Sequence, residues 1–331
     1  MPQAFMVAND IPAQPTTFFP TVSVIVPIYN GETDLPGLIE CLLGQTYPAD
    51  RVDYLLVDND SCDRTPDILN EAITQARATN HTLKYLSETQ IQSAYAARNT
   101  GIRAATGEIL AFTDADCYPA TTWLENLVQG FKDDAIGLCV GEIKALPGST
   151  WLERYAERKN IMSQQDTLNH TFCPYGQTAN IAVRTCALKE VGLFRPHMTT
   201  GGDADICWRL QQGGWQLHYA KTAVVQHHHR TTLKELRKQW YRYGRSNRYL
   251  HQIHGVKLAR PLMAHETRYS LARWIAKELP AGLVRMAMGK ADLIDLVMTP
   301  IGLYCFRART LGQRESRLPE NAADIAWLDS D

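Results

Sequence analysis

Short runs of apolar, often β-branched residues recur through the first third of the chain, and each is followed by a segment with a helical pattern. The runs are Val22–Pro27, Tyr54–Val57, Leu83–Leu86 and Ile109–Phe112. Each is too short for a buried helix. Three of them are apolar on both faces, as in a strand that is covered on both sides, and Leu83–Leu86, which contains Lys84, is a weaker strand signal. Strands that alternate with helices at this spacing predict an α/β fold with a doubly wound, mostly parallel sheet.

Helix start signals support this alternation. Asp34 can cap a helix that runs to about Gly44, and Thr65-Pro66 opens another, with proline at a tolerated first-turn position. The alanine-rich stretch 93–105 predicts a third helix. The first half of the chain therefore has the βαβ pattern in which helices connect parallel strands.

Polar residues follow three of the expected strands at the point where each ends. They are Tyr29 and Asn30, Asp58 and Asp60, and Asp114 and Asp116. Any one of them is explained as a turn former or helix cap. Their coincidence at three strand ends is better explained by a ligand site, because ligands of such sheets bind at the carboxyl ends of the strands.

Asp114 and Asp116 are separated by one residue on the loop that leaves the fourth strand. Two carboxylates this close repel each other unless a cation or hydrogen-bond donors lie between them. Mg²⁺ is commonly held by one or two carboxylates together with substrate phosphates. The pair therefore predicts a divalent-cation site.

Beyond Gly130 the pattern is mixed. We expect strands over 136–143, 178–183, 215–219 and 223–226, and helices over 150–165 and 206–212. From Thr232 onward the chain is helical, basic and aromatic. The expected domains are a loose N-terminal arm over 1–20, an α/β domain over 21–230 with halves 21–117 and 118–230, a basic helical extension over 231–314 and an acidic tail over 315–331.

Charge separates these regions although 34 basic and 35 acidic residues nearly cancel overall. Residues 1–226 contain 16 basic and 25 acidic side chains, whereas residues 227–314 contain 17 basic and 5 acidic ones. The basic region is either a solvated helical face or a surface for an anionic partner.

Four segments occur in order, three of them at the expected strand ends and one in the expected helix 93–105. They are Val24–Asn30, Val57–Thr65, Ala97–Gly101 and Thr113–Asp116. Together they resemble the nucleotide-sugar half of family 2 glycosyltransferases of the GT-A fold, and Gly201–Leu210 is similar to that family's acceptor-side segment. The resemblance extends from about residue 21 to about residue 250, and it implies a GT-A sheet and transfer from a nucleotide-diphosphate sugar.

The resemblance also implies roles for individual residues. Pro27, Tyr29 and Asn30 would line the nucleotide cleft, and Asp58 would accept a hydrogen bond from the base, which we expect to be uracil. Arg98 would lie over the base or near phosphate, or else be an ordinary surface arginine. We therefore expect these residues, with those below, to bind the donor.

The remaining donor-side residues are the metal ligands. Asp114 would contact the ribose or the metal, and Asp116 would be the main carboxylate ligand of Mn²⁺ or Mg²⁺. A histidine beyond the acceptor segment often completes the metal shell in this family. Here His227 is favoured and His229 is second, since alternate strand residues share a face; a solvated strand end is the alternative explanation of these histidines.

The acceptor segment departs from the family pattern, which usually has Glu-Asp where this chain has Gly202-Asp203. Asp203 matches the aspartate that deprotonates the acceptor hydroxyl, and attack opposite the leaving diphosphate inverts the anomeric centre. Asp205 is the alternative base or an acceptor-positioning group. Both acids could instead be a helix cap and a first-turn acid.

The pattern of the C-terminal region indicates a segment that lies on a membrane surface rather than a transmembrane helix. Basic residues alternate with tryptophan and tyrosine over 230–249, and Leu283–Phe306 is apolar but interrupted by charges. This segment can lie in the interface of an anionic membrane, or the region can be a helical lid on the catalytic domain. Nucleic acid is not an expected partner, because no nucleic-acid module is present.

We therefore expect a metal-assisted, inverting glycosyltransferase of polysaccharide biosynthesis that uses a UDP-sugar and a glycan or lipid-linked acceptor. A sugar-phosphate nucleotidyltransferase and a non-catalytic glycan- or membrane-binding relative are the alternatives. The eight cysteines form no C-x-x-C pair, and the N-terminus has no signal-peptide pattern. The expected location is the cytoplasm, with peripheral binding to the cytoplasmic face of a membrane.

Overall fold

The computed structural model describes residues 18–148 and 150–328. Two compact units divide the chain, and we describe each by itself. The α/β unit comprises the described residues up to Lys144, then Met162–His227, and the described residues from Pro319 onward. The helical unit comprises Ala145–Ile161 and His228–Leu318. Most of the expected arm over 1–20 lies outside the described residues.

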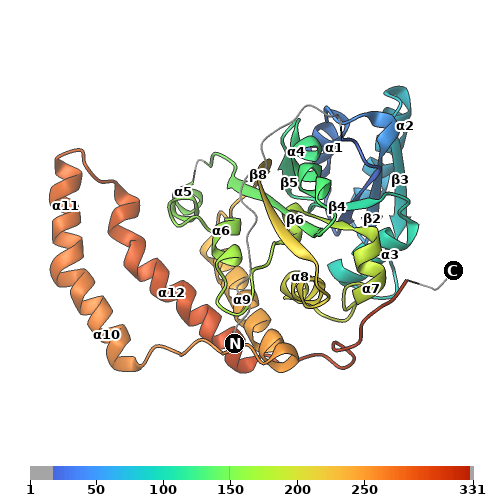
Figure 1. The fold of residues 1–331 in the computed structure, drawn as a ribbon. Coiled ribbons are helices and arrows are strands. Elements are labelled where there is room, and N and C mark those ends of the chain that lie inside the picture. Colours follow the sequence, from blue (N-terminus) through green and yellow to red (C-terminus); the bar gives the residue numbers. More distant parts are fainter. Residues whose placement is uncertain (1–17, 149, 329–331) are drawn as a thin grey trace. The chain divides into compact units, whose positions relative to one another are not determined.

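The expected parallel half of the sheet is present. Strands β1 (Val22–Ile28), β2 (Val52–Asp58), β3 (Thr82–Ser87) and β4 (Ile109–Phe112) lie in the order β3-β2-β1-β4, and all three pairings are parallel. Every residue of β1, β2 and β4 is buried. Apolar residues on both faces of these strands are thus explained by cover on both sides (Figure 1).

Three helices connect these strands. They are α1 (Leu35–Leu43), α2 (Thr65–Ala78) and α3 (Ala94–Ala104). Ser93 caps α3 by accepting a hydrogen bond from the backbone N–H of Tyr95. Asp34 occupies the cap position of α1 without a side-chain cap bond. The predicted alternation of strands and helices is confirmed.

The second half of the sheet is antiparallel. It contains β5 (Cys117–Pro119), β6 (Ile136–Ala145), β7 (Ile181–Arg184) and β8 (Gln216–His227), and the whole order is β3-β2-β1-β4-β7-β6-β8-β5. Pairing is antiparallel between β4 and β7, β6 and β7, and β5 and β8. The two strands expected over 215–219 and 223–226 are one strand, β8, and the strand expected from residue 178 begins at Ile181, after a 3-10 turn (Thr178–Asn180).

Four further helices belong to the α/β unit: α4 (Trp123–Val128), α6 (Gln164–Leu168), α7 (Thr185–Val191) and α8 (Gly202–Gln212). Short 3-10 turns occur at Ala49–Arg51 and Gln129–Lys132. No pattern in the sequence predicted β5, α4 or α7. The single helix expected over 150–165 is interrupted, because α5 (Trp151–Arg158) ends before the left-handed Asn160 and Met162.

The helical unit contains α5, α9 (Leu233–His254), α10 (Ala264–Arg273), a π-helical turn (Trp274–Glu278), α11 (Leu279–Ala287) and α12 (Leu293–Glu315). A small core of buried residues joins α5, α9 and α12, formed by Leu152, Tyr155, Leu236, Ile294, Ile301 and Cys305. Glycines allow α9 and α12 to meet closely, since a Cβ at Gly244 or Gly312 would strike the backbone of the other helix. Within the described residues, no helix is both long enough and apolar enough to cross a membrane.

Candidate active site

The loops that follow β1 and β2 are hydrogen-bonded to each other. Asn30 has a left-handed backbone (φ 51°), its N–H donates to Ser61 Oγ (2.8 Å), and its Oδ1 accepts from the Cys62 N–H (2.9 Å). Tyr29, just before it, is 54% exposed, whereas Pro27 is buried within β1. Asn30 therefore fixes the two strand ends to each other, and Tyr29 offers its ring at that edge.

Asp58 ends β2 and is buried. One carboxylate oxygen accepts from the Ser61 N–H (3.1 Å) and the other from the Tyr85 hydroxyl (3.3 Å). Burial, and next the charge of Asp58, raise the pKa of Tyr85. The tyrosine thus stays protonated and continues to donate to Asp58 at neutral pH.

Arg98 lies on α3, and its guanidinium pairs with Asp114 at 2.5 Å. The Arg98 residue is only 3% exposed, so it is not an ordinary surface arginine. Its guanidinium also lies over the rings of Tyr95 (5.6 Å) and Phe194 (5.9 Å). Arg98 thereby joins the strand-end carboxylate Asp114 to two aromatic side chains.

Asp116 and His227 come together because β5 pairs with β8, which places Cys117 opposite His227. Asp116 Oδ2 lies 3.1 Å from His227 Nε2. Ligand atoms of Asp116, Cys117 and His227 all lie within 4.8 Å of one another. His227 is buried and Asp116 is partly exposed, so the carboxylate is on the open side of this cluster.

Cys117 belongs to the hydrophobic core, and burial, followed by the charges of Asp114 and Asp116, raises the pKa of its thiol well above the usual value. Mg²⁺ and Mn²⁺ favour carboxylate over thiol ligands. The donor set that suits such a cation is therefore Asp116 with His227. His229, the second candidate, belongs to the helical unit.

Asp203 lies in the first turn of α8 and is partly buried. Its Oδ1 accepts a hydrogen bond from Thr178 Oγ1 (2.9 Å), which comes from the 3-10 turn before β7. The N-cap of α8 is Gly201, so Asp203 is not the cap itself. A hydroxyl from a separate element thus orients the Asp203 carboxylate.

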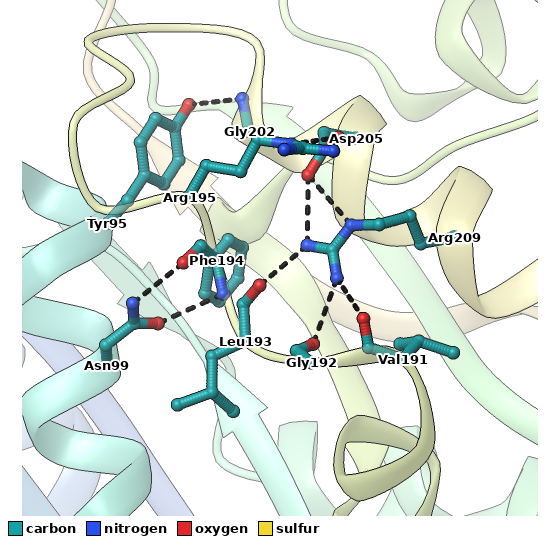
Figure 2. Close-up of polar contacts among 10 residues, drawn as sticks. All are labelled: Tyr95, Asn99, Val191, Gly192, Leu193, Phe194, Arg195, Gly202, Asp205 and Arg209. Atoms are coloured by element: carbon teal, nitrogen blue, oxygen red, sulfur yellow. Dashed lines mark hydrogen bonds and ion pairs between the residues drawn. The ribbon is translucent and has the colours of Figure 1, made fainter. Parts of the chain in front are cut away.

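Asp205 has a different environment from the one expected for a base or an acceptor contact. It is fully buried, and its two oxygens pair with Arg195 (2.9 Å) and Arg209 (2.9 Å). The Arg209 guanidinium also donates to the carbonyls of residues 191, 192 and 193 (Figure 2). The geometry gives Asp205 the place of a scaffold residue that shapes the segment before α8.

Several residues of this region were not singled out from the sequence. Asn99 exchanges two hydrogen bonds with the backbone of Phe194, and Ser93 Oγ donates to the Met198 carbonyl (2.9 Å). Asn99 belongs to the Ala97–Gly101 segment, so a signal existed. No local pattern indicates that Tyr95 contacts Gly202 or that Arg195 pairs with Asp205. These contacts tie α3 to the segment before α8.

The geometry defines a class: a GT-A-type α/β domain with carboxylates at the carboxyl edge of its parallel strands. Comparison with known proteins agrees. The family model "Glycosyl transferase family 2" matches residues 23–191, and "Glycosyl transferase family group 2" matches residues 109–308. The glycosyltransferase AglE of Haloferax volcanii is 32% identical over 262 residues, which is 78% of this chain and 81% of that protein.

The pre-mycofactocin glycosyltransferase of Mycobacterium tuberculosis is 31% identical over 84% of this chain, but this chain spans only 56% of that protein. Among solved structures, the mannosyltransferase PcManGT from Pyrobaculum calidifontis aligns with a TM-score of 0.63 at 20% identity, covering 95% of this chain and 91% of that one. It therefore supports the fold. The chain belongs to glycosyltransferase family 2, and it is a glycosyltransferase.

Proposed function

We propose that this glycosyltransferase moves a sugar from a nucleotide-diphosphate donor, in our view a UDP-sugar, to a hydroxyl of a glycan or lipid-linked acceptor in polysaccharide biosynthesis. The observation that carries the proposal is the convergence of Asp116 and His227 at 3.1 Å beside the strand-end carboxylate Asp114. Two structural neighbours support donor binding: PcManGT was solved with GDP-Man and Mn²⁺, and Staphylococcus aureus TarS (TM-score 0.51) with UDP-GlcNAc.

Asp116 and His227 would hold the divalent cation. A carboxylate oxygen suits both Mn²⁺ and Mg²⁺, and an imidazole nitrogen, the softer ligand, favours Mn²⁺ of the two. When bound, that cation neutralises negative charge on the departing diphosphate. Asp114 would contact the ribose or the metal while it keeps Arg98 in place. Asp58 would accept from the nucleobase, and Pro27, Tyr29 and Asn30 would line the cleft beside it.

Asp203 would act as the general base. It would accept the proton of the acceptor hydroxyl while the acceptor oxygen forms a bond to the anomeric carbon and the bond to the diphosphate breaks. Attack from the face opposite the diphosphate inverts the configuration. The hydrogen bond from Thr178 supports this role, because it holds the carboxylate in one orientation.

The decisive experiment separates binding from chemistry. Asp203→Asn should lower the rate of transfer by at least about 100-fold, since general bases contribute about 10²- to 10⁴-fold. Binding of UDP with Mn²⁺, measured by calorimetry, should be unchanged. The exposed Asp67→Asn in α2 is the matched control and should transfer at the wild-type rate. Wild-type turnover by Asp203→Asn would reject the assignment.

The peripheral membrane contact is proposed for a different segment from the one expected. Leu283–Phe306 was predicted to lie in the interface, but α12 buries Ile294, Ile301 and Cys305 in the helical core. By contrast, α10 and α11 contain no buried residue. The large exposed apolar side chains of this stretch are Leu262, Met263, Tyr269, Leu271, Ile275, Leu283, Val284, Met286 and Met288.

The occupant that we propose for this α10–α11 surface is an anionic bilayer, on its cytoplasmic face, and the charge of the surface supports it. Glu266 and Glu278 are already paired with Arg260 and Arg273, which leaves a positive excess. The cations that carry this excess among the apolar residues are Arg268, Lys277, Arg285 and Lys290. A second copy would bring like charges together, whereas anionic headgroups attract them.

Flotation with liposomes tests this surface. Vesicles that contain phosphatidylserine should carry the wild-type chain at low salt, and Leu283→Glu/Val284→Glu should abolish flotation. Leu233→Glu, an exposed leucine of α9, is the matched control and should still float. Flotation of the double variant, or none of the wild type, would contradict the proposal.

A further inference from the structure

The N-terminus of α8, which carries Asp203, is capped by a residue from another helix. The first N–H groups of a helix have no partner within it. Gly201, at the N-cap, supplies no side-chain cap. The Gly202 N–H instead donates to the hydroxyl of Tyr95 (2.9 Å), which extends from α3 (Figure 2).

Gly202 and Tyr95 are also matched in shape. A Cβ at Gly202 would lie 2.7 Å from two atoms of the Tyr95 ring, closer than real Cβ contacts allow. Gly202 starts a regular helix, so the ring, not backbone strain, excludes a larger residue. The absence of the glutamate that the family resemblance implies here therefore has a structural reason: Tyr95 fills that space.

Tyr95 is itself held from the donor side. Its ring stacks on Phe194 at 5.7 Å with an interplanar angle of 18°, and the Arg98 guanidinium covers it. Arg98 in turn pairs with Asp114. Polar and aromatic contacts thus run without interruption from Asp114 through Arg98 and Tyr95 to Gly202, the residue directly before Asp203.

We propose that Tyr95 is a positioning residue: it fixes the first turn of α8 so that the Asp203 carboxylate meets the acceptor hydroxyl. This inference rests on the proposed role of Asp203. Thr178 holds the carboxylate itself, and Tyr95 holds the backbone from which it extends. Misplacement of a catalytic group by a fraction of an ångström slows the chemical step without weakening donor binding.

Tyr95→Phe removes the hydroxyl and keeps the ring. It should lower kcat about threefold to tenfold, as expected for one lost hydrogen bond, and leave the KM for the donor unchanged. Tyr54→Phe is the control, since the Tyr54 hydroxyl makes a buried bond to the Leu42 carbonyl (2.6 Å) away from α8, and it should retain the wild-type kcat. Unchanged kcat in Tyr95→Phe, or an equal loss in Tyr54→Phe, would overturn the proposal.

A double-mutant cycle tests the matched shapes. Gly202→Ala alone should lower kcat by more than tenfold, because its methyl group strikes the ring. In a Tyr95→Ala background the same substitution should cost less than threefold, because the space is open. Equal losses in the two backgrounds would show that the ring does not act on Gly202.

Hydrogen exchange distinguishes failure of this inference from failure of the proposed function. In Tyr95→Phe, the peptide around residues 200–206 should exchange faster while peptides of β1 and β2 stay protected. This result requires no substrate. If the 200–206 peptide of Tyr95→Phe keeps its wild-type protection, the Tyr95 hydroxyl does not hold the first turn of α8, even if the enzyme is active. If that peptide exchanges faster but kcat is unchanged, the contact exists but does not matter for catalysis. Inactivity of the wild type with every nucleotide-sugar would refute the proposed function alone.

Discussion

In the α/β unit every residue of β1 and β2 is buried, whereas α10 and α11 of the helical unit contain no buried residue. Both regions nevertheless contain large apolar side chains, such as Leu55 in β2 and Leu283 in α11. The difference lies in what surrounds each segment. Strands β1 and β2 are covered on both faces, whereas α10 and α11 contact α12 and the π-helical turn between them without burying any residue of their own. Apolar residues therefore stabilise the first region and mark the second as a contact surface.

Carboxylates differ in the same way. In the α/β unit, Asp205 is fully buried between two arginines. In the helical unit, the acids whose pKa is lowered lie near the surface and hold helix ends or ion pairs, as Glu153, Glu235 and Asp292 do. A buried ion-paired carboxylate thus stabilises the first unit at Asp205, while these acids of the second unit form bonds that solvent and pH can reach.

The largest expected effect is a loss of kcat on substitution of a metal-site residue in the α/β unit. Asp116→Asn should lower kcat by about 10²- to 10⁴-fold and weaken the response to Mn²⁺, because the amide is a poorer cation ligand than the carboxylate. Asp292→Asn is the control in the helical unit, since asparagine still caps α12. It should transfer to a soluble acceptor within twofold of wild type. Equal losses in both variants would contradict the division of roles.

Substitution of one leucine in each unit tests the contrast in burial through the free energy of unfolding. Leu55→Ala in β2, where the residue is 0% exposed, should lower the free energy of unfolding by about 2–5 kcal/mol. Leu283→Ala in α11, where the residue is 47% exposed, should change it by less than about 0.5 kcal/mol. Chemical denaturation gives both values. A large loss in Leu283→Ala would mean that α11 is packed in solution.

We expect acid to unfold the helical unit at a higher pH than the α/β unit. Hydrogen bonds from Thr150, Thr232 and Arg158 lower the pKa values of Glu153, Glu235 and Asp292 respectively. A lowered pKa stabilises the fold above the unfolded pKa, near 4, and this contribution is lost as the pH falls through the folded value. Between pH 5 and pH 2, pulsed hydrogen exchange should show α5, α9 and α12 losing protection before β1 and β2. Simultaneous loss would contradict this order.

A small effect on the free energy of unfolding is expected from the ion pairs of Arg158. Arg158 bonds Asp292 (2.5 Å) and Asp295 (3.0 Å), but all three side chains are more than a third exposed. Arg158→Met should therefore cost less than about 1 kcal/mol at pH 7. The loss should shrink at pH 2, where both acids are protonated, and in high salt. A cost that does not depend on pH would show that packing, not charge, holds the arginine.

Local patterns determined much of this protein. Runs of β-branched residues between helical segments were enough to predict β1 to β4 and α1 to α3, because strand and helix periodicity is a property of neighbouring residues. The strand-end carboxylates and the family motifs indicated the class of enzyme. The short elements β5, α4 and α7 were not predicted from the sequence, because segments of three to seven residues are too short to show a clear periodicity.

Tertiary structure decided which of those residues meet. Only the antiparallel pairing of β5 with β8 brings His227 to Asp116, and only the packing of α3 against the segment before α8 places Tyr95 under Gly202. Burial between Arg195 and Arg209 gave Asp205 its scaffold position. The sequence by itself set the elements and the chemical groups, because both are local; pairing, burial and exposure depend on residues far apart in the chain, so the folded arrangement alone fixed them.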